Sequence, residues 1–395
     1  MQRRTLLKTA ALGAASGAIG TPWVASAQGA TVKIGLILPM TGPFASTGRQ
    51  IEAAAKLYMA QNGATVAGQK VELILKDDTG TADVTKRLAQ ELIVNEKVGV
   101  IAGFGLTPLA LAVAPLATQA KVPAICMAAA TSTITEASPY IVRSGFTVPQ
   151  ITVPLAEWST KNGIKKVVSV VSDYGPGLDA EKAYKERLLA SGGEIAGELR
   201  VPLRNPDFSP FLQRAADAKP DAVFAFVPSG VGAQFMKQYV ERGLDKSGIK
   251  LIVTGDVVDD DILNDMGDVA LGIVSSHHYS AAHDSPENKS YVAAFRAAAG
   301  GLRPNFHSVG GFDGMRLIYE ALKKTGGKPG GDDLVAAMKG MSWASPRGPM
   351  SIDPATRDVV QNVYMRRVEK VGSELYNVEF ATVANVKDPV KAAKG

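Results

Sequence analysis

Apolar runs that are typical of buried strands alternate with amphipathic, helix-like stretches along most of the chain. Residues 32–38 are an almost continuous apolar run, as expected of a parallel strand buried on both faces, and a helical pattern follows over residues 47–62. The alternation continues with strands predicted over residues 71–75, 98–102 and 122–127, each separated from the next by a helix. This rhythm predicts a parallel sheet with helices on both faces, which is a doubly wound α/β domain.

A second series of the same kind begins near residue 150. It predicts helices over residues 150–161, 178–191, 208–217, 230–242 and 259–266, and strands over residues 167–171, 194–200, 221–226, 249–253 and 271–275. Residues 286–340 are mostly helical in pattern, and residues 350–368 supply late strands, so we expect the two domains to share the tail. The prediction is therefore two doubly wound lobes that face each other across a cleft, with ligands bound outside the carboxyl ends of the strands.

The first 27 residues have the pattern of an export signal. Paired arginines at positions 3 and 4 precede a weakly apolar stretch rich in glycine and alanine, and the small residues 25–27 follow. We expect a twin-arginine-type signal that is cut after Ala27; a general secretion signal also begins with positive residues. A membrane anchor is the weaker option because Pro22 breaks the short apolar run. Both signals place the mature chain outside the inner membrane.

Composition excludes several classes of protein. Without Arg3, Arg4 and Lys8 of the signal the formal net charge falls from +5 to +2 (5 − 3 = 2), and no basic stripe carries interleaved aromatic residues, so we do not expect nucleic-acid binding. Cys126 is the only cysteine, which makes a disulfide framework impossible. Its apolar neighbours predict a buried thiol at the end of a strand.

Two threonines follow neighbouring predicted strands and give the strongest indication of a binding site. Thr107 opens the helix after the strand at 98–102, and Thr131 lies in the turn after the strand at 122–127. The free backbone N–H groups and the dipole at such a helix N-terminus suit an anion, so both turns together predict a carboxylate site. The alternative interpretation is that both threonines are ordinary N-caps.

One glycine-rich motif raises the question of a dinucleotide site. Residues 175–180 fit the pattern G-x-G-x-x-A and lie between a predicted strand and a predicted helix. Pro176 fits poorly between the two glycines, and no acidic residue closes the following strand, where a ribose would need it. We therefore interpret the motif as a tight turn from strand to helix.

The histidines and acidic residues form no catalytic constellation. His277, His278 and His283 cluster, but adjacent residues on a strand point to opposite faces and no Cys or Glu stands at ligand spacing, so a solvated or inter-lobe loop is expected. The three aspartates at 259–261 are expected in the first turn of a helix. Because the sequence also lacks a G-x-S-x-G, H-E-x-x-H or P-loop motif, we expect no enzyme, no metal and no cofactor.

Several short stretches, taken in order and spacing, resemble a known family. They are residues 34–48 (IGLILPMTGPFASTG), 77–78 (DD), 128–131 (AAAT), 173–177 (DYGPG), 207–209 (DFS) and 220–222 (PDA). Together they are similar to the leucine/isoleucine/valine-binding type of periplasmic receptor for ABC importers, over about residues 31 to 385. The resemblance implies capture of a small-molecule carboxylate in the periplasm, delivery to ABC permease and ATPase subunits, and contact with the membrane only through the permease.

The resemblance also implies a type I periplasmic binding protein fold, in which three crossing segments join the two lobes. We expect these segments near residues 146–148, 275–279 and 341–348. The N-terminal lobe would then comprise residues 28–147 and 277–345, and the C-terminal lobe residues 148–276 and 346–395.

Positions that match the family's motifs suggest the residues that bind the ligand. Thr107 and Thr131 match the hydroxyl residues that hold the ligand's carboxylate in relatives that bind amino acids, with assistance from backbone groups at Leu106 and Ala129. Tyr174 matches the aromatic residue that the opposite lobe contributes when the lobes close.

Departures from the family pattern bear on the identity of the ligand. Amino-acid binders hold the α-ammonium with acids of the second lobe, but residues 144–149 contain no acid, and Val257 occupies the other acidic position while Asp256 lies one place away. A buried ammonium without its partner costs several kcal/mol, whereas a charge-assisted hydrogen bond contributes only ~1.5–3 kcal/mol. We therefore expect an amine-free carboxylate, preferably an aromatic acid of the benzoate, hydroxybenzoate or cinnamate type, enclosed by the aromatic side chains Phe44, Phe146, Tyr174 and Phe226.

Other functions stay open at this point. A branched-chain or other amino-acid-binding protein of the same transporter class is the main alternative. A secreted α/β enzyme would need a catalytic site that the sequence does not show. A ligand-sensing subunit of a signalling system would share the fold and differ only in its partner.

Overall fold

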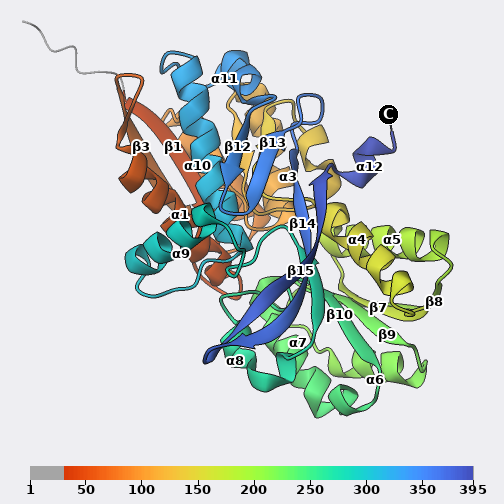
Figure 1. The fold of residues 1–395 in the computed structure, drawn as a ribbon. Coiled ribbons are helices and arrows are strands. Elements are labelled where there is room, and N and C mark those ends of the chain that lie inside the picture. Colours follow the sequence, from red (N-terminus) through yellow and green to blue (C-terminus); the bar gives the residue numbers. More distant parts are fainter. Residues whose placement is uncertain (1–30, 395) are drawn as a thin grey trace, which may run out of the picture.

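Two sheets, one in each of two lobes, organise the computed structural model, which describes residues 31–394 (Figure 1). The predicted export signal lies outside the described residues. None of the helices within residues 31–394 combines the length and the hydrophobicity that a membrane-spanning segment needs.

The first sheet has the strand order β2-β3-β1-β4-β5-β6. Its strands are β1 (Thr31–Leu38), β2 (Thr65–Val66), β3 (Gln69–Asp77), β4 (Val100–Gly103), β5 (Ala124–Cys126) and β6 (Ile141–Arg143). All pairs are parallel except that of β2 with β3. The apolar run of the first strand is buried almost throughout, as its lack of polar alternation predicts.

Helices from two parts of the chain cover this sheet. The early ones are α1 (Ala45–Asn62), α2 (Ala82–Val94) and α3 (Thr107–Ala120), and the late ones are α10 (Phe306–Lys324) and α11 (Gly331–Met338). A further late helix, α9 (Pro286–Ala298), packs against α1. Figure 1 shows α10, drawn in light blue, beside α1, drawn in red, so the chain returns to the first lobe after it has built the second. The predicted helical stretch after residue 286 is confirmed.

The second sheet has the order β12-β13-β14-β11-β10-β9-β7-β8, with β15 paired to β14. Its parallel part consists of β7 (Lys166–Ser172), β8 (Glu194–Val201), β9 (Ala222–Phe226), β10 (Lys250–Thr254) and β11 (Val274–His277). The helices of this lobe are α4 (Val148–Lys161), α5 (Gly175–Ala190), α6 (Ser209–Asp217), α7 (Ser229–Glu241) and α8 (Leu263–Met266). Two buried apolar clusters lie on opposite faces of the sheet, as a doubly wound lobe requires.

The tail of the chain joins the lobes along one long strand. The tail elements are β12 (Ser342–Ser345), β13 (Gly348–Ile352), β14 (Val359–Val371), β15 (Glu374–Val386) and α12 (Pro389–Ala392). Val359 at the start of β14 packs in the core of the first lobe, whereas Val368 packs in a core of the second. Figure 1 shows this strand running between the two halves of the molecule. The lobe boundaries that the sequence suggests stay a prediction, since both lobes share β14.

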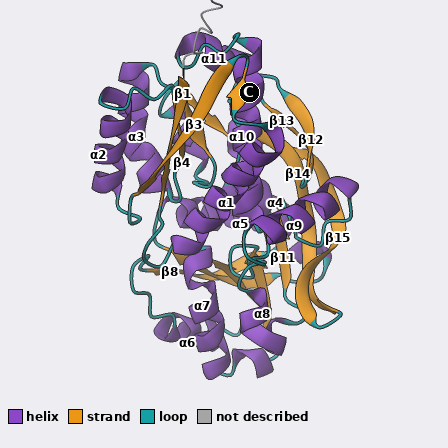
Figure 2. Ribbon diagram, turned by 90° about the vertical axis from the view of Figure 1, so that its left-hand side faces the viewer, coloured by secondary structure: helices purple, strands orange, loops and turns teal. Residues whose placement is uncertain are grey.

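Two local expectations differ from the structure. The predicted helix over residues 259–266 shortens to α8, so Asp259 and Asp260 are buried in the loop before it rather than placed in a first helical turn. The strand β15 was not expected because its second half is mostly exposed and lacks an apolar run. The side view in Figure 2 shows that it forms the outer edge of the second sheet with β14.

Candidate functional site

A cavity lies between the lobes, where the carboxyl ends of strands from both sheets meet. It has an empty volume of about 390 Å³, part of which is open to solvent. The first lobe contributes the turns after β1, β4 and β5, and the second lobe contributes those after β7, β9 and β10. The lining residues on which the following paragraphs rely are Phe44, Leu106, Thr107, Ala129, Phe146, Tyr174, Phe226, Ser229, Asp256 and His307.

The turn after β4 has a shape that only small residues allow. Gly103 has φ of +110°, and a Cβ atom there would lie 2.3 Å from the carbonyl oxygen of Ile37. A Cβ atom at Gly105 would lie 2.7 Å from the ring of Pro39. These two glycines let the chain turn sharply and place Leu106 and Thr107 at the N-terminus of α3, facing the cavity.

Thr107 and Thr131 meet across the turns after β4 and β5. Their hydroxyl oxygens are 2.9 Å apart and hydrogen-bonded, and neither hydroxyl caps the helix that it begins. Their proximity is as the sequence predicts, and the N-cap interpretation is wrong. The backbone N–H groups of Leu106, Thr107 and Thr131 donate no hydrogen bond to any described residue, so they stay open to an anion.

The backbone of Ala129, by contrast, is already hydrogen-bonded within the protein. Its N–H donates to the carbonyl oxygen of Phe104 at 2.9 Å, and its own carbonyl accepts from Arg143 and from the thiol of Cys126. Ala129 therefore forms part of the cavity wall. Burial raises the pKa of the Cys126 thiol to about 11, which agrees with the predicted buried, unreactive cysteine.

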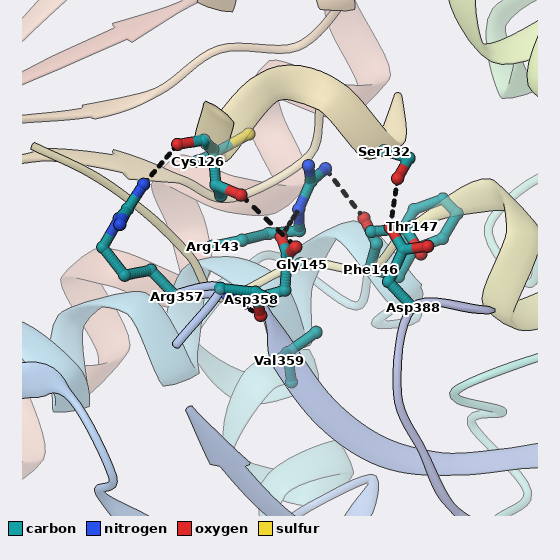
Figure 3. A network of polar contacts seen from close by, with 12 residues as sticks. Cys126, Ser132, Arg143, Gly145, Phe146, Thr147, Arg357, Asp358, Val359 and Asp388 are labelled. Atoms are coloured by element: carbon teal, nitrogen blue, oxygen red, sulfur yellow. Dashed lines mark hydrogen bonds and ion pairs between the residues drawn. The ribbon is translucent and has the colours of Figure 1, made fainter. Parts of the chain in front are cut away.

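A buried arginine, Arg143, pairs with Asp358 and donates to the carbonyl oxygen of Phe146 (Figure 3). It also holds the turn that carries Thr131. The guanidinium of Arg143 donates to the carbonyl oxygens of Ala129 and Thr131 at 2.6 and 2.7 Å and forms an ion pair with Asp358 at 2.7 Å. Lys391 of α12 contacts the same carboxylate. Sequence reasoning missed this network because Asp358 lies 215 residues from Arg143 and no local pattern pairs them.

The second lobe closes over the two threonines with the N-terminus of α5. Tyr174 precedes this helix and stacks on Phe226, with ring centroids 6.3 Å apart. A Cβ atom at Gly175 would lie 2.7 Å from the hydroxyl oxygen of Thr131, so the two lobes are in close contact here. A Cβ atom at Gly177 would lie 1.8 Å from the carbonyl oxygen of Ser172, which explains the glycines as a tight turn.

Further contacts across the cleft show that the lobes are closed. The backbone N–H of Ser132 donates to Asp179 of α5 at 2.8 Å, and the hydroxyl of Ser46 in α1 donates to Asp261. Arg204 donates to the carbonyl oxygen of Gly80 at 3.3 Å. These contacts join the two lobes across the cleft.

The end of the cavity near the hinge is polar and deeply buried. Asp256 follows β10 and lines the cavity, whereas its neighbour Val257 packs in the core. Nε2 of His277 lies 3.5 Å from Oδ2 of Asp256. Burial lowers the pKa of His277 to about 4 and that of His307 to about 3, so both rings are neutral at pH 7.

The structure thus brings together most of the residues that the sequence predicts for the site. Leu106, Thr107, Ala129, Tyr174, Phe44 and Asp256 line one cavity, and Thr131 joins them through Thr107. His307 and Ser229 were missed, because each begins a helix without a recognisable motif. His277 and His278 are fully buried rather than solvated, and no three possible metal ligands cluster within residues 31–394.

Comparisons with known proteins agree with this architecture. Residues 31–373 match the periplasmic binding protein family. The chain is 65% identical to a solute-binding protein of an ABC transporter from Rhodopseudomonas palustris BisB5, solved in complex with 3,4-dihydroxybenzoic acid. The match covers 91% of this chain and 99% of that chain, with a TM-score of 0.90.

Two further relatives are less similar to this chain, each at about 45% identity. A solute-binding protein from R. palustris, solved in complex with 4-hydroxybenzoate, is 45% identical over 91% of this chain and 99% of its own, with a TM-score of 0.88. The Leu/Ile/Val-binding protein homolog 6 of Brucella melitensis biotype 1 is 46% identical over 363 residues, which are 91% of this chain and 93% of the relative. The chain therefore belongs to the periplasmic binding protein family, whose members are solute-binding receptors with the type I fold.

Proposed function

We propose that this protein is an extracytoplasmic receptor that captures a small aromatic carboxylate between its lobes and delivers it to an ABC importer. The observation that carries the proposal is the composition of the cavity, which combines an anion site at one end with flat aromatic walls. The relatives solved with hydroxybenzoates support the same ligand class.

The proposed carboxylate grip consists of Thr107 and Thr131. Two hydroxyls and several free backbone N–H groups converge where the N-termini of α3 and α5 face each other. Both helix dipoles favour negative charge at this point. A ligand carboxylate would take up hydrogen bonds that the closed protein leaves unmade.

The walls and the size of the cavity favour one flat ring. Phe146 and Phe226 are buried aromatic residues that line it, half-buried Tyr174 lines it beside them, and Phe44 covers it from the first lobe. The volume of about 390 Å³ includes open solvent, so the enclosed part of the cavity is smaller still. A single benzene ring with short substituents therefore suits it better than a larger acid.

The main alternative ligand is an amino acid, and Asp256 is the observation that favours it. The relatives named as Leu/Ile/Val-binding homologues point the same way. An ammonium, however, carries three donors and needs several acceptors, whereas Asp256 is the one acidic side chain that lines the cavity within the described residues. The buried guanidinium of Arg366 also lies beside it, since a Cβ atom at Gly255 would contact Nη2.

The proposed cycle begins with capture by the first lobe and continues with hinge closure, which brings Tyr174 and Asp256 over the ligand. The closed form would then dock on permease and ATPase subunits in the membrane. The mature chain would begin at Gln28, after a twin-arginine-type signal that is removed in the course of export to the periplasm.

A thermal-shift screen of the chain from Gln28 onward tests the proposal. One panel holds the twenty amino acids, and the other holds benzoates, hydroxybenzoates and cinnamates. A ligand at 100 times its dissociation constant adds about 2.7 kcal/mol to the free energy of unfolding, so a true ligand raises the melting temperature by several degrees. Shifts with aromatic acids alone support the proposal. Shifts with leucine or valine alone refute the ligand class and leave the receptor intact.

A further inference from the structure

Three polar groups on one wall of the cavity have no hydrogen-bond partner among the described residues. They are Oδ2 of Asp256, Oγ of Ser229 and Nδ1 of His307. The side chains belong to residues that are only 5%, 7% and 6% exposed, and all three residues line the cavity. The nearest side-chain partner of Oδ2 is Nε2 of His277 at 3.5 Å, and that nitrogen also makes no hydrogen bond. Buried polar groups in folded proteins are nearly always hydrogen-bonded, so these groups point to a ligand group that pairs with them.

The chemistry of the three groups suits a hydroxyl. A carboxylate accepts hydrogen bonds, a neutral imidazole has one donor and one acceptor nitrogen, and a serine hydroxyl does both. His307 stays neutral because burial lowers its pKa to about 3. A phenolic hydroxyl can donate to Asp256 and accept from a neighbour at the same time, without bringing a charge into this buried place.

The distance between this wall and the Thr107–Thr131 pair determines which ring position of the ligand can carry the hydroxyl. Asp256 follows β10, whereas the Thr107–Thr131 pair faces Gly175, which follows β7. The strands β7 and β10 are separated by β9, and two strand spacings amount to about 10 Å. A flat ring between the two places holds its carboxylate at one end and presents the opposite ring position to Asp256 and His307.

We propose that Asp256 and His307 bind a ring hydroxyl para to the ligand's carboxylate, so that the receptor selects 4-hydroxylated benzoates over benzoate. Ser229 adds a hydrogen bond to the same hydroxyl or to one beside it. This inference rests on the proposed function, since it assumes that an aromatic acid occupies the cavity.

Isothermal titration calorimetry with matched ligands tests the selection. The probes are benzoate, 4-fluorobenzoate and 4-hydroxybenzoate, which differ only at the para position. We expect the wild-type protein to bind 4-hydroxybenzoate at least about tenfold more tightly than benzoate, as one hydrogen bond to a charged group provides. 4-Fluorobenzoate fills similar space but cannot donate, so it should bind like benzoate.

Substitutions at the wall separate recognition from folding. In Asp256→Ala and His307→Phe, the affinity for 4-hydroxybenzoate should come within about threefold of the affinity for benzoate, because the hydrogen bond that favours the hydroxyl is lost. Benzoate affinity itself serves as the check that each variant folds and closes. Asp179→Asn is the matched control: it weakens the contact with Ser132 across the cleft, and should lower the affinity for all three acids by one common factor.

The outcomes distinguish the two levels of inference. Equal wild-type affinities for benzoate and 4-hydroxybenzoate overturn the hydroxyl site while the aromatic-acid receptor stands. An unchanged preference in both wall variants overturns the roles of Asp256 and His307. Binding of amino acids with no binding of any aromatic acid overturns the proposed function, and this inference with it.

Discussion

The two ends of the cavity differ in how far the protein satisfies their polar groups by itself. At the first end, Thr107 and Thr131 bond to each other, and Arg143 holds the carbonyl oxygens of the turn that carries Thr131. At the second end, Asp256 and His307 each keep an atom with no hydrogen bond to any described residue. Both ends keep groups that a ligand could pair with, but only at the first end does the framework hydrogen-bond the side chains and the turn that carry the site.

This difference suggests that the two ends have different roles in ligand recognition. A preorganised anion site binds any carboxylate that fits, because its donors are in place before the ligand arrives. A wall of buried unpaired groups discriminates instead, since a ligand that cannot pair with them leaves them desolvated. If the protein binds an aromatic acid as proposed, the first end would recognise the carboxylate and the second end would discriminate between acids.

The largest expected effect comes from removing the support of the first end. Arg143→Met deletes a buried guanidinium that pairs with Asp358 and donates to three backbone carbonyl oxygens. Breaking such a buried pair costs about 3–5 kcal/mol, so the free energy of unfolding in urea should fall by that order.

Arg357→Met is the matched control for this variant. Arg357 belongs to the same network but is only partly buried, and it donates to Ile141 and Thr135 instead of the Thr131 turn. We expect a smaller loss of stability and little change in ligand affinity. Equal losses in both variants would mean that Arg143 does not specifically support the anion site.

The next effect is on affinity rather than stability. Thr107→Val and Thr131→Val keep the side-chain shape and remove one hydroxyl each, which should cost about 1.5–3 kcal/mol of binding free energy for an aromatic acid. Calorimetric titration with 4-hydroxybenzoate measures this loss. Thr118→Val changes a threonine of the same helix whose hydroxyl contacts Ser138 outside the cavity, and should leave affinity unchanged. Full affinity in both site variants would count against the carboxylate grip.

The same contrast separates what the sequence could predict from what it could not. The parallel strands and the turns after them follow local rules of periodicity and turn chemistry, so Thr107 could be placed near the site from sequence. Tyr174 and Asp256 were placed there only by the resemblance to a known family. The Arg143–Asp358 pair and the position of His307 depend on contacts between distant segments. The short helix α8 and the exposed strand β15 lack the apolar pattern that marks their partners.

Acid should lower the free energy of unfolding through His277, which lies beside Asp256 at the second end of the cavity. The pKa of buried His277 falls from its usual 6.5 to about 4, so the folded state binds fewer protons than the unfolded state between these values. Stability from this residue is present above pH 6.5 and is lost as pH falls, by about 2 kcal/mol at pH 5. Urea unfolding of wild type and His277→Gln at pH 7 and pH 5 measures it. The wild type should lose more stability than the variant, and an identical loss in both contradicts the prediction.

The smallest expected effect concerns the contact that closes the mouth of the cavity. Burial raises the pKa of Asp261, which accepts from Ser46 across the cleft and lies near Asp259 and Asp260. Closure of the two lobes moves the carboxyl group of Asp261 away from water, and this favours its protonated form. The closed state therefore binds protons more readily than the open state, and affinity should rise as pH falls through the raised pKa of this carboxyl group. Asp261→Asn removes this titration, so its affinity should change less than that of the wild type as pH falls, and at pH 8 it should exceed that of the wild type by a few-fold, roughly 1 kcal/mol or less. The exposed Asp265 of α8 supplies the control variant Asp265→Asn, which should keep the wild-type pH dependence. If Asp261→Asn keeps it as well, the contact with Ser46 does not contribute to closure through its charge.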